Sequence, residues 1–171
     1  AILREAGVTT EDILVCAGNG YADSLSASAT GKPILLVGKS LTTNQKNFLK
    51  SINSSRAYAI GDKSVVSEAV MSAVKSSMGI SNYERFAGAT RYQTSKMVAE
   101  KFFPSASKVV LAYGQNFPDG LSGGPIAYSL GAPLILVSNT KYSDAQSYCK
   151  SKGMQNVVVM GDDSLISDAV A

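Results

Sequence analysis

Ser122 stands in a sequence pattern that supports nucleophilic chemistry in many enzymes. The stretch Gly120-Leu121-Ser122-Gly123-Gly124 fits Gly-x-Ser-x-Gly, the nucleophile elbow of α/β hydrolases. A serine at such an elbow attacks an acyl carbon only when a base, usually histidine, takes its proton. The sequence contains no histidine. The absence of histidine therefore disfavours a serine hydrolase, which is kept as an alternative.

The turn that carries Ser122 occurs twice. Gly114 to Gly124 and Gly18 to Ser26 each follow an apolar run, with glycine, an aromatic residue, aspartate, leucine and serine at matching steps. The two copies are 96 residues apart (114 minus 18), and the first copy lacks the Gly-x-Ser-x-Gly pattern. We therefore expect binding rather than catalysis at these turns, with the following candidate ligand contacts: Asn19, Asp23, Ser26, Asn116, Asp119 and Ser122.

The position of these turns favours a ligand site but also allows a structural role. In an open α/β sheet, the turn after a strand lines the crevice where ligands bind, and N–H groups at a helix start attract anions. Alternatively, Asp23 and Asp119 bond the free N–H groups of a first helical turn, while the serines and glycines allow close packing. A carboxylate repels an anionic ligand unless a cation or an arginine intervenes.

Two arginines and a tyrosine lie between the copies, in the segment from Arg85 to Ser95. Arg91 is a predicted partner for Asp119, or for an aspartate across an interface between copies. Arg85 and Arg91 are also candidate contacts for an anionic polymer, because a guanidinium holds a phosphate or carboxylate with two hydrogen bonds. Tyr92 is a candidate for stacking on a sugar, and packing at the helix start is its alternative.

Nucleotide, metal and cofactor chemistry lack their sequence signatures. Gly18-Asn19-Gly20 does not complete Gly-x-Gly-x-x-Gly, and no Walker lysine follows. The carboxylates show no metal-ligand spacing. We expect no cofactor and no metal.

Composition supports a folded α/β protein. The 171 residues are 45% hydrophobic and 17% charged, which is enough apolar content to bury a core. The net charge of +3 is spread without runs of like charge, so a nucleic-acid-binding arm is not expected. No apolar stretch reaches the roughly 18 residues of a membrane span, and two cysteines, Cys16 and Cys149, define no disulfide framework.

Short apolar runs alternate with helical patterns along the chain. Runs opened by Pro33 and Pro133 have the unbroken apolar character of strands buried on both faces. Thr42 or Thr43 is predicted to cap one helix, and Ser64 the next. This alternation predicts right-handed βαβ units, a mainly parallel sheet and covering helices. The predicted strands are 13–17, 33–37, 57–60, 109–113, 133–137 and 157–160.

The duplication divides the chain into two predicted repeats. Gly61-Asp62 with Ser64 and Ser67 recurs 100 residues later (161 minus 61). We expect one repeat over 1–80, truncated at its N-terminal side, and a nearly complete one over 81–171.

These motifs together resemble the cell wall binding type 2 repeat. They are Arg-x-x-Gly-x-Thr-Arg-Tyr-x-Thr-Ser at 85–95, Phe-Pro-Asp-Gly-Leu-Ser at 117–122, the two Pro-apolar strands and the Gly-Asp-x-Ser-x-x-Ser-x-Ala-Val endings. The resemblance covers essentially the whole chain. It implies tandem Rossmann-like repeats of Gram-positive surface or secreted proteins, usually three packed about a pseudo-threefold axis.

The resemblance also implies a function. We expect a non-catalytic module at the cell wall or extracellular surface that binds anionic wall polysaccharide or a teichoic-type polymer and packs against other repeats. One alternative is a structural scaffold that self-associates. Another is a small α/β hydrolase or an amidase-associated segment.

Overall fold

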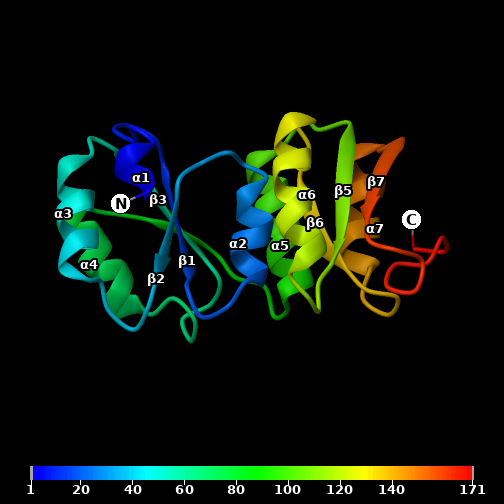
Figure 1. The fold of residues 1–171 in the computed structure, drawn as a ribbon, viewed down its shortest axis with the longest axis horizontal. Coiled ribbons are helices and arrows are strands. Elements are labelled where there is room, and N and C mark those ends of the chain that lie inside the picture. The colour runs from blue at the N-terminus through cyan, green and yellow to red at the C-terminus, as the bar shows by residue number, and fades with distance from the viewer. Residues whose placement is uncertain (1, 171) are drawn as a thin grey trace. The chain divides into compact units, whose positions relative to one another are not determined.

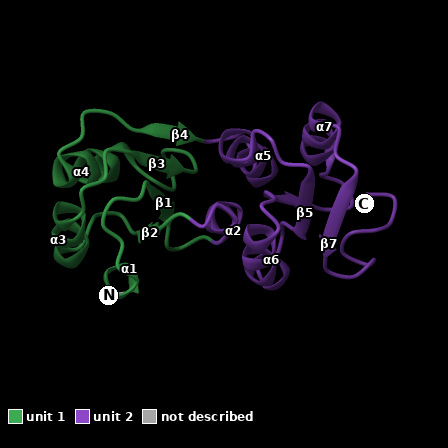
Figure 2. Cartoon of the chain, turned by 90° about the horizontal axis from the view of Figure 1, so that it is seen from above, with its two compact units in different colours: residues 1–20, 32–86 green, residues 21–31, 87–171 purple. Residues whose placement is uncertain are grey.

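The computed structural model describes residues 2–170 and divides into two compact units (Figures 1 and 2). Unit 1 comprises residues 1–20 and 32–86, and unit 2 comprises residues 21–31 and 87–171. The units cut across the predicted repeats, because residues 21–31 belong to unit 2 and residues 81–86 to unit 1. The boundaries 1–80 and 81–171 describe the sequence duplication and remain a prediction.

Unit 1 is a parallel four-stranded sheet with helices. The strand order is β2-β1-β3-β4, with β1 at Ile13–Ala17, β2 at Ile34–Val37, β3 at Ala57–Ile60 and β4 at Glu84–Phe86. Its helices are α1 (Ile2–Glu5), α3 (Thr43–Ser51) and α4 (Glu68–Met78), and α3 lies beside α4 (Figure 1). Every residue of β1 and β3 is buried, as their unbroken apolar sequences predict.

Unit 2 is a parallel three-stranded sheet covered on both faces. The order is β6-β5-β7, with β5 at Lys108–Tyr113, β6 at Leu134–Val137 and β7 at Asn156–Met160. Side chains of β5 and β6 alternate between two core clusters, one with Ala127 of α6 (Pro118–Ser129) and the other with Tyr148 of α7 (Ser143–Lys152). These features confirm the predicted α/β fold of parallel βαβ units.

A helix from the first half of the sequence completes unit 2. Helix α2 (Ala22–Ser28), which connects β1 to β2, packs against α6, β6 and α5 (Arg91–Phe102). Figure 2 shows this segment in the colour of unit 2. The helix that follows the duplicated motif of the first half therefore packs against helices and a strand of the second half, and the adjoining Ala29 joins one of its two core clusters.

Helix starts were predicted with one error. Of the two predicted caps of α3, Thr42 and Thr43, Thr42 forms the cap, through a complete capping box with Gln45. Ser64 does not cap α4; its hydroxyl donates to Asp62 Oδ1 (2.6 Å), and Ser67 accepts from the Val70 N–H instead. Asp62 competes successfully for the Ser64 hydroxyl, so the helix begins one turn later. None of the helices between residues 2 and 170 is long and apolar enough to cross a membrane.

Candidate functional site

Gly114 ends β5 and brings the start of α5 against it. The Gly114 N–H donates to the Val137 carbonyl (2.8 Å), which repeats the bond from Gly18 to Val37 (2.8 Å) in unit 1. A Cβ at Gly114 would lie 2.6 Å from Cε1 of Tyr92, so only glycine fits beside this ring. Tyr92 is 8% exposed and belongs to the unit 2 core. The structure thus shows the packing arrangement for Tyr92.

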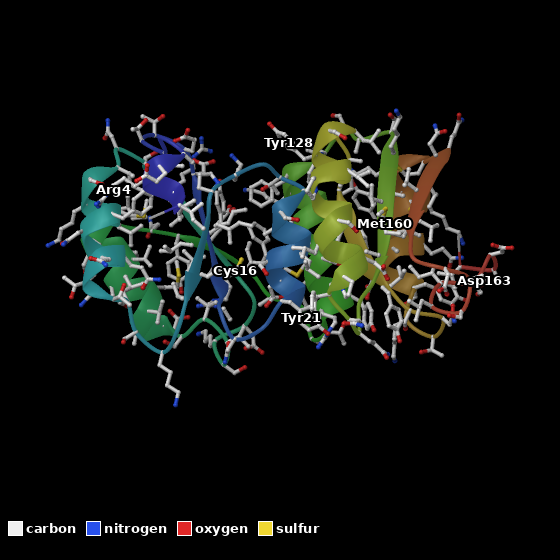
Figure 3. The ribbon with its side chains drawn as sticks, viewed as in Figure 1. Arg4, Cys16, Tyr21, Tyr128, Met160 and Asp163 are labelled. Carbon is white, nitrogen blue, oxygen red and sulfur yellow. The ribbon has the colours of Figure 1, made fainter. Side chains whose placement is uncertain are left out.

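Arg91 organises a cluster at this end of β5. Its Nη1 donates to the Gly114 carbonyl (2.6 Å) and to the Tyr21 hydroxyl oxygen (3.1 Å), and its guanidinium carbon lies 5.4 Å from the Tyr21 ring centroid. The Tyr21 hydroxyl in turn donates to the Gln115 carbonyl (2.7 Å). The Phe117 ring lies 6.0 Å from the Tyr21 ring. We call these five residues the Arg91 cluster; Figure 3 labels Tyr21 at the start of α2.

The predicted ion pair between Arg91 and Asp119 does not form. In the described chain, Arg91 makes the contacts above and no salt bridge, and its Nη1 bonds the Gly114 carbonyl rather than a carboxylate. The Asp119 carboxylate lies beside Gly161 instead, where an added Cβ would be 3.1 Å from Oδ2. Asp119 lies in the first turn of α6, where a carboxylate was expected to accept from a free N–H group. At this helix start, the Phe117 N–H donates to Asn116 Oδ1 (2.9 Å) and not to Asp119.

The two repeated serines donate to their own helices. Ser122 Oγ donates to the carbonyls of Pro118 and Asp119 (both 3.2 Å), and Ser26 Oγ donates to the Asp23 carbonyl (3.0 Å). Ser122 lies inside α6 rather than on a strand-to-helix turn, which is where a nucleophile elbow must place its serine. Neither position nor partners activate this hydroxyl.

The glycines around Ser122 allow α6 to approach α2. A Cβ at Gly120 would lie 2.6 Å from Cδ1 of Leu25, and one at Gly124 would collide with the Ser28 side chain. The Gly-x-Ser-x-Gly pattern is therefore explained by close helix packing.

Arg85, in unit 1, is committed to internal contacts. Its side chain is 14% exposed; Nη1 donates to the Gly61 carbonyl (2.8 Å), and Nη2 contacts Glu68 Oε1 (3.3 Å). Nη2 also lies 3.3 Å from the Tyr83 hydroxyl. These bonds fasten β4 to the end of β3 and to α4.

The remaining candidates divide between the units. Asn19 lies in an exposed turn of unit 1, whereas Asp23, Ser26, Asn116, Asp119 and Ser122 lie with Arg91 and Tyr92 in unit 2. Sequence reasoning missed Tyr21 as a partner of Arg91, and it missed Gln115 and Phe117 as partners of Tyr21. Their signal was the aromatic residue at matching steps of both turns, Tyr21 and Phe117. Among the described residues, no group of three or more His, Cys, Asp or Glu side chains is placed to hold a metal ion.

The repeated Gly-Asp-x-Ser turns are electrostatically alike. The Ser64 hydroxyl and N–H lower the pKa of Asp62, and those of Ser164 do the same for Asp162. These turns follow β3 and β7 at corresponding positions. A family model described as "Cell wall binding domain 2" matches residues 1–71 and 85–171, which includes both turns.

The chain belongs to the cell wall binding domain 2 family. The family match confirms the resemblance to the cell wall binding type 2 repeat and locates the protein at the cell wall or extracellular surface. Among curated proteins of Bacillus subtilis (strain 168), the chain is 28% identical over 185 residues to N-acetylmuramoyl-L-alanine amidase LytC. That match covers 99% of this chain and 34% of the amidase. The chain is 27% identical over 162 residues to the amidase enhancer, and that match covers 92% of this chain and 22% of that protein.

Two solved structures share the fold of this chain. Cwp6 from Clostridium difficile superposes with a TM-score of 0.83 at 24% identity, covering 95% of this chain and 27% of that one. Cwp8 from the same organism gives 0.75 at 27% identity, covering 90% and 27%. The chain thus spans between about a fifth and a third of the length of each relative. It is a wall-binding module of this family, matched to the amidase over part of that enzyme's length.

Proposed function

We propose that this module is non-catalytic and holds the protein on anionic polymers of the Gram-positive cell wall, an anionic polysaccharide or a teichoic-type polymer. The observation that carries the proposal is the state of Arg91. Its Nη1 is bonded within the protein, whereas its Nε and Nη2 have no hydrogen-bond acceptor among residues 2–170, and the residue is exposed. A guanidinium held in this way presents two donors to a phosphate or carboxylate.

Aromatic rings beside Arg91 fit a sugar-containing polymer. Phe117 is 50% exposed and lies against Tyr21, whose ring is under the Arg91 guanidinium. An aromatic ring offers an apolar surface to the apolar face of a sugar while the arginine takes the anionic group. Asn116 and Ser122, exposed in the same turn and helix, are further polar contacts in this proposal. The negative charge of Asp119 repels an anionic group, so the polymer approaches this turn from the side of Arg91.

Retention on cell walls tests the proposal. Purified Gram-positive walls should retain the chain, and walls stripped of anionic polymers should retain much less. Rising salt should release it, because exposed ion pairs are screened. Repeated weak sites along a polymer raise retention through effective concentration. Equal retention on intact and stripped walls would overturn the proposal.

A second proposal is that α6 packs against another repeat. Leu121 is 63% exposed and Tyr128 is 62% exposed, and with Phe117 and Pro125 they form an apolar stripe along α6. The residue of α2 that corresponds to Leu121 is Leu25 (121 minus 96), which is only 5% exposed because it packs on Gly120. A third helix of this type would cover the α6 stripe in the same way, as a pseudo-threefold arrangement requires. Light scattering tests this self-association, and Leu121→Asp should abolish it without reducing wall retention per monomer.

A further inference from the structure

The outer edge of β7 is an unpaired strand edge. In the part of the chain that the structure describes, β7 pairs with β5 on one side and with no strand on the other. The backbone groups of successive strand residues point to opposite sides. Since Asn156 and Val158 face β5, the N–H and C=O groups of Val157, Val159 and Gly161 face outward. Val157 is also 38% exposed.

Unit 1 shows which kind of segment covers such an edge. Strand β3 corresponds to β7 at the 100-residue offset. Strand β4 pairs in parallel with β3, with Ala59 opposite Arg85 and Ile60 opposite Phe86. The Gly61 N–H donates to the Phe86 carbonyl (2.8 Å). This bond closes the end of the β3 edge.

Side chains of the β4 segment add specific contacts. Arg85 donates to the Gly61 carbonyl and contacts Glu68, and the Tyr83 hydroxyl donates to Glu68 Oε2 (2.6 Å). The Phe86 ring lies 6.0 Å from the Tyr58 ring. An aromatic residue, an arginine two positions later and a second aromatic residue directly after it thus contact one strand edge.

Unit 2 carries the corresponding receptor groups. Gly161 has a positive φ of 124°, like Gly61 at 105°, so both strands end in the same type of turn. Asp162 and Asp168 stand where Asp62 and Glu68 stand in unit 1. The Asp119 carboxylate beside Gly161 adds negative charge at this end. Figure 3 labels Met160 at the end of β7 and Asp163 in the acidic turn that follows.

We propose that the outer edge of β7 is a docking site for an extended segment of the β4 type, with the pattern aromatic-x-Arg-aromatic, which adds as a parallel fourth strand. Main-chain hydrogen bonds hold such a strand, and side-chain pockets select it. The acidic end of the edge complements the arginine of the segment. It also disfavours parallel pairing of two β7 edges with each other, since that would bring their acidic ends together.

A peptide of the chain's own residues 81–89, blocked at both ends, is the probe. Added to the isotope-labelled chain at up to about 1 mM, it should shift the amide signals of Val157, Val159 and Gly161 and slow their hydrogen exchange. The same peptide with Arg85→Ala should bind about fivefold more weakly, because it loses the charged contact. A scrambled peptide should not bind.

Variants of the chain distinguish peptide binding at the outer edge of β7 from a general effect of charge. Val157→Pro removes an outward N–H and should abolish peptide binding, whereas Val157→Thr keeps the N–H and should retain it. Asp168→Lys should weaken binding, and Glu5→Lys, which makes the same charge change in unit 1, should not. Binding that is absent, or unaffected by both Val157→Pro and Asp168→Lys, would overturn the proposal. So would protection of these amides that rises with protein concentration alone, because it would identify edge-to-edge pairing of two copies.

Discussion

Arg91 Nη1 donates a 2.6 Å hydrogen bond to the carbonyl oxygen of Gly114, and this bond ties the start of α5 to the end of β5. The same nitrogen contacts the Tyr21 hydroxyl, so one side of the guanidinium is oriented by the protein. An arginine held from one side is pre-organised for an anion on the other, which lowers the entropy lost on binding.

Arg91→Ala should weaken wall retention about tenfold, which corresponds to about 1.4 kcal/mol, because a charge-assisted contact is lost. Arg91→Lys should recover part of the salt dependence but not the full retention, since an ammonium lacks the planar pair of donors. Lys39→Ala removes an exposed positive charge from unit 1 and serves as the matched control. Similar retention of the Arg91→Ala and Lys39→Ala variants would contradict a specific role for Arg91.

Ser122→Ala should change neither wall retention nor the thermal midpoint measurably. The hydroxyl donates only to carbonyls of its own helix and is exposed, and such surface substitutions stay within about 0.5 kcal/mol. Incubation of the chain with purified peptidoglycan should release no soluble fragments. Fragment release that disappears in Ser122→Ala would instead establish a hydrolase.

Gly124→Ala should destabilise the protein by about 1–2 kcal/mol, because the overpacking penalty exceeds the gain in helix propensity. The added Cβ would collide with Ser28 Oγ and lie 3.0 Å from Ser28 Cβ. Denaturant unfolding measures the change, with Ser129→Ala on the same helix as the control. Ser28→Gly should recover part of the loss in the double variant, and strict additivity of the two changes would argue against this contact.

Strands β1, β3 and β6 were predictable to within one residue at each end because they are buried on both faces, and continuous burial requires continuous apolar sequence. The prediction that the Pro33 run is buried on both faces was wrong, because β2 lies at an edge of its sheet and Leu36 is 50% exposed. The placement of α2 was not predictable in this way. Its packing depends on Leu25 meeting Gly120 and Ser28 meeting Gly124, which lie about a hundred residues away, and local periodicity carries no information on such a pairing. Strand β4 is only three residues long and half-buried, so it has no periodic signal.

The sequence predicted where the candidate site lies, but not which groups contact Arg91. The repeated turn and the following arginine indicated where polar groups gather. Opposite charge predicted Asp119 as the partner of Arg91, whereas the structure uses the Gly114 carbonyl and Tyr21. A backbone carbonyl has no sequence signature, because every residue carries one.

Acid should remove a stabilising contact of Glu68. The Tyr83 hydroxyl, followed by Lys63 and Arg85, holds the pKa of Glu68 below its ordinary value of 4.5. A carboxyl with a depressed folded-state pKa contributes stability above its unfolded-state pKa, and that contribution is lost as pH falls through the folded-state value. Stability measured from pH 5 downward should therefore fall less steeply in Glu68→Gln than in the parent chain. Equal slopes would show that Glu68 titrates alike in both states.

Alkali should destabilise the core of unit 2 through Tyr148. This side chain is fully buried, its hydroxyl donates to the Phe103 carbonyl (3.0 Å), and burial raises its pKa from 10.0 to about 12. A group whose folded-state pKa is raised contributes stability below its unfolded-state pKa, here 10.0, and loses it as pH rises through about 12.

Tyr148→Phe should cost about 1 kcal/mol at neutral pH, because the Phe103 carbonyl loses its donor. Between pH 10 and 12 the parent chain should lose stability faster than the variant, so the two unfolding curves should converge. Denaturant midpoints measured at pH 7, 10 and 11 follow this convergence, and Tyr128→Phe, an exposed tyrosine of the same unit, is the control. A constant difference between parent and Tyr148→Phe across that range would mean that the Tyr148 hydroxyl titrates alike in the folded and unfolded chains.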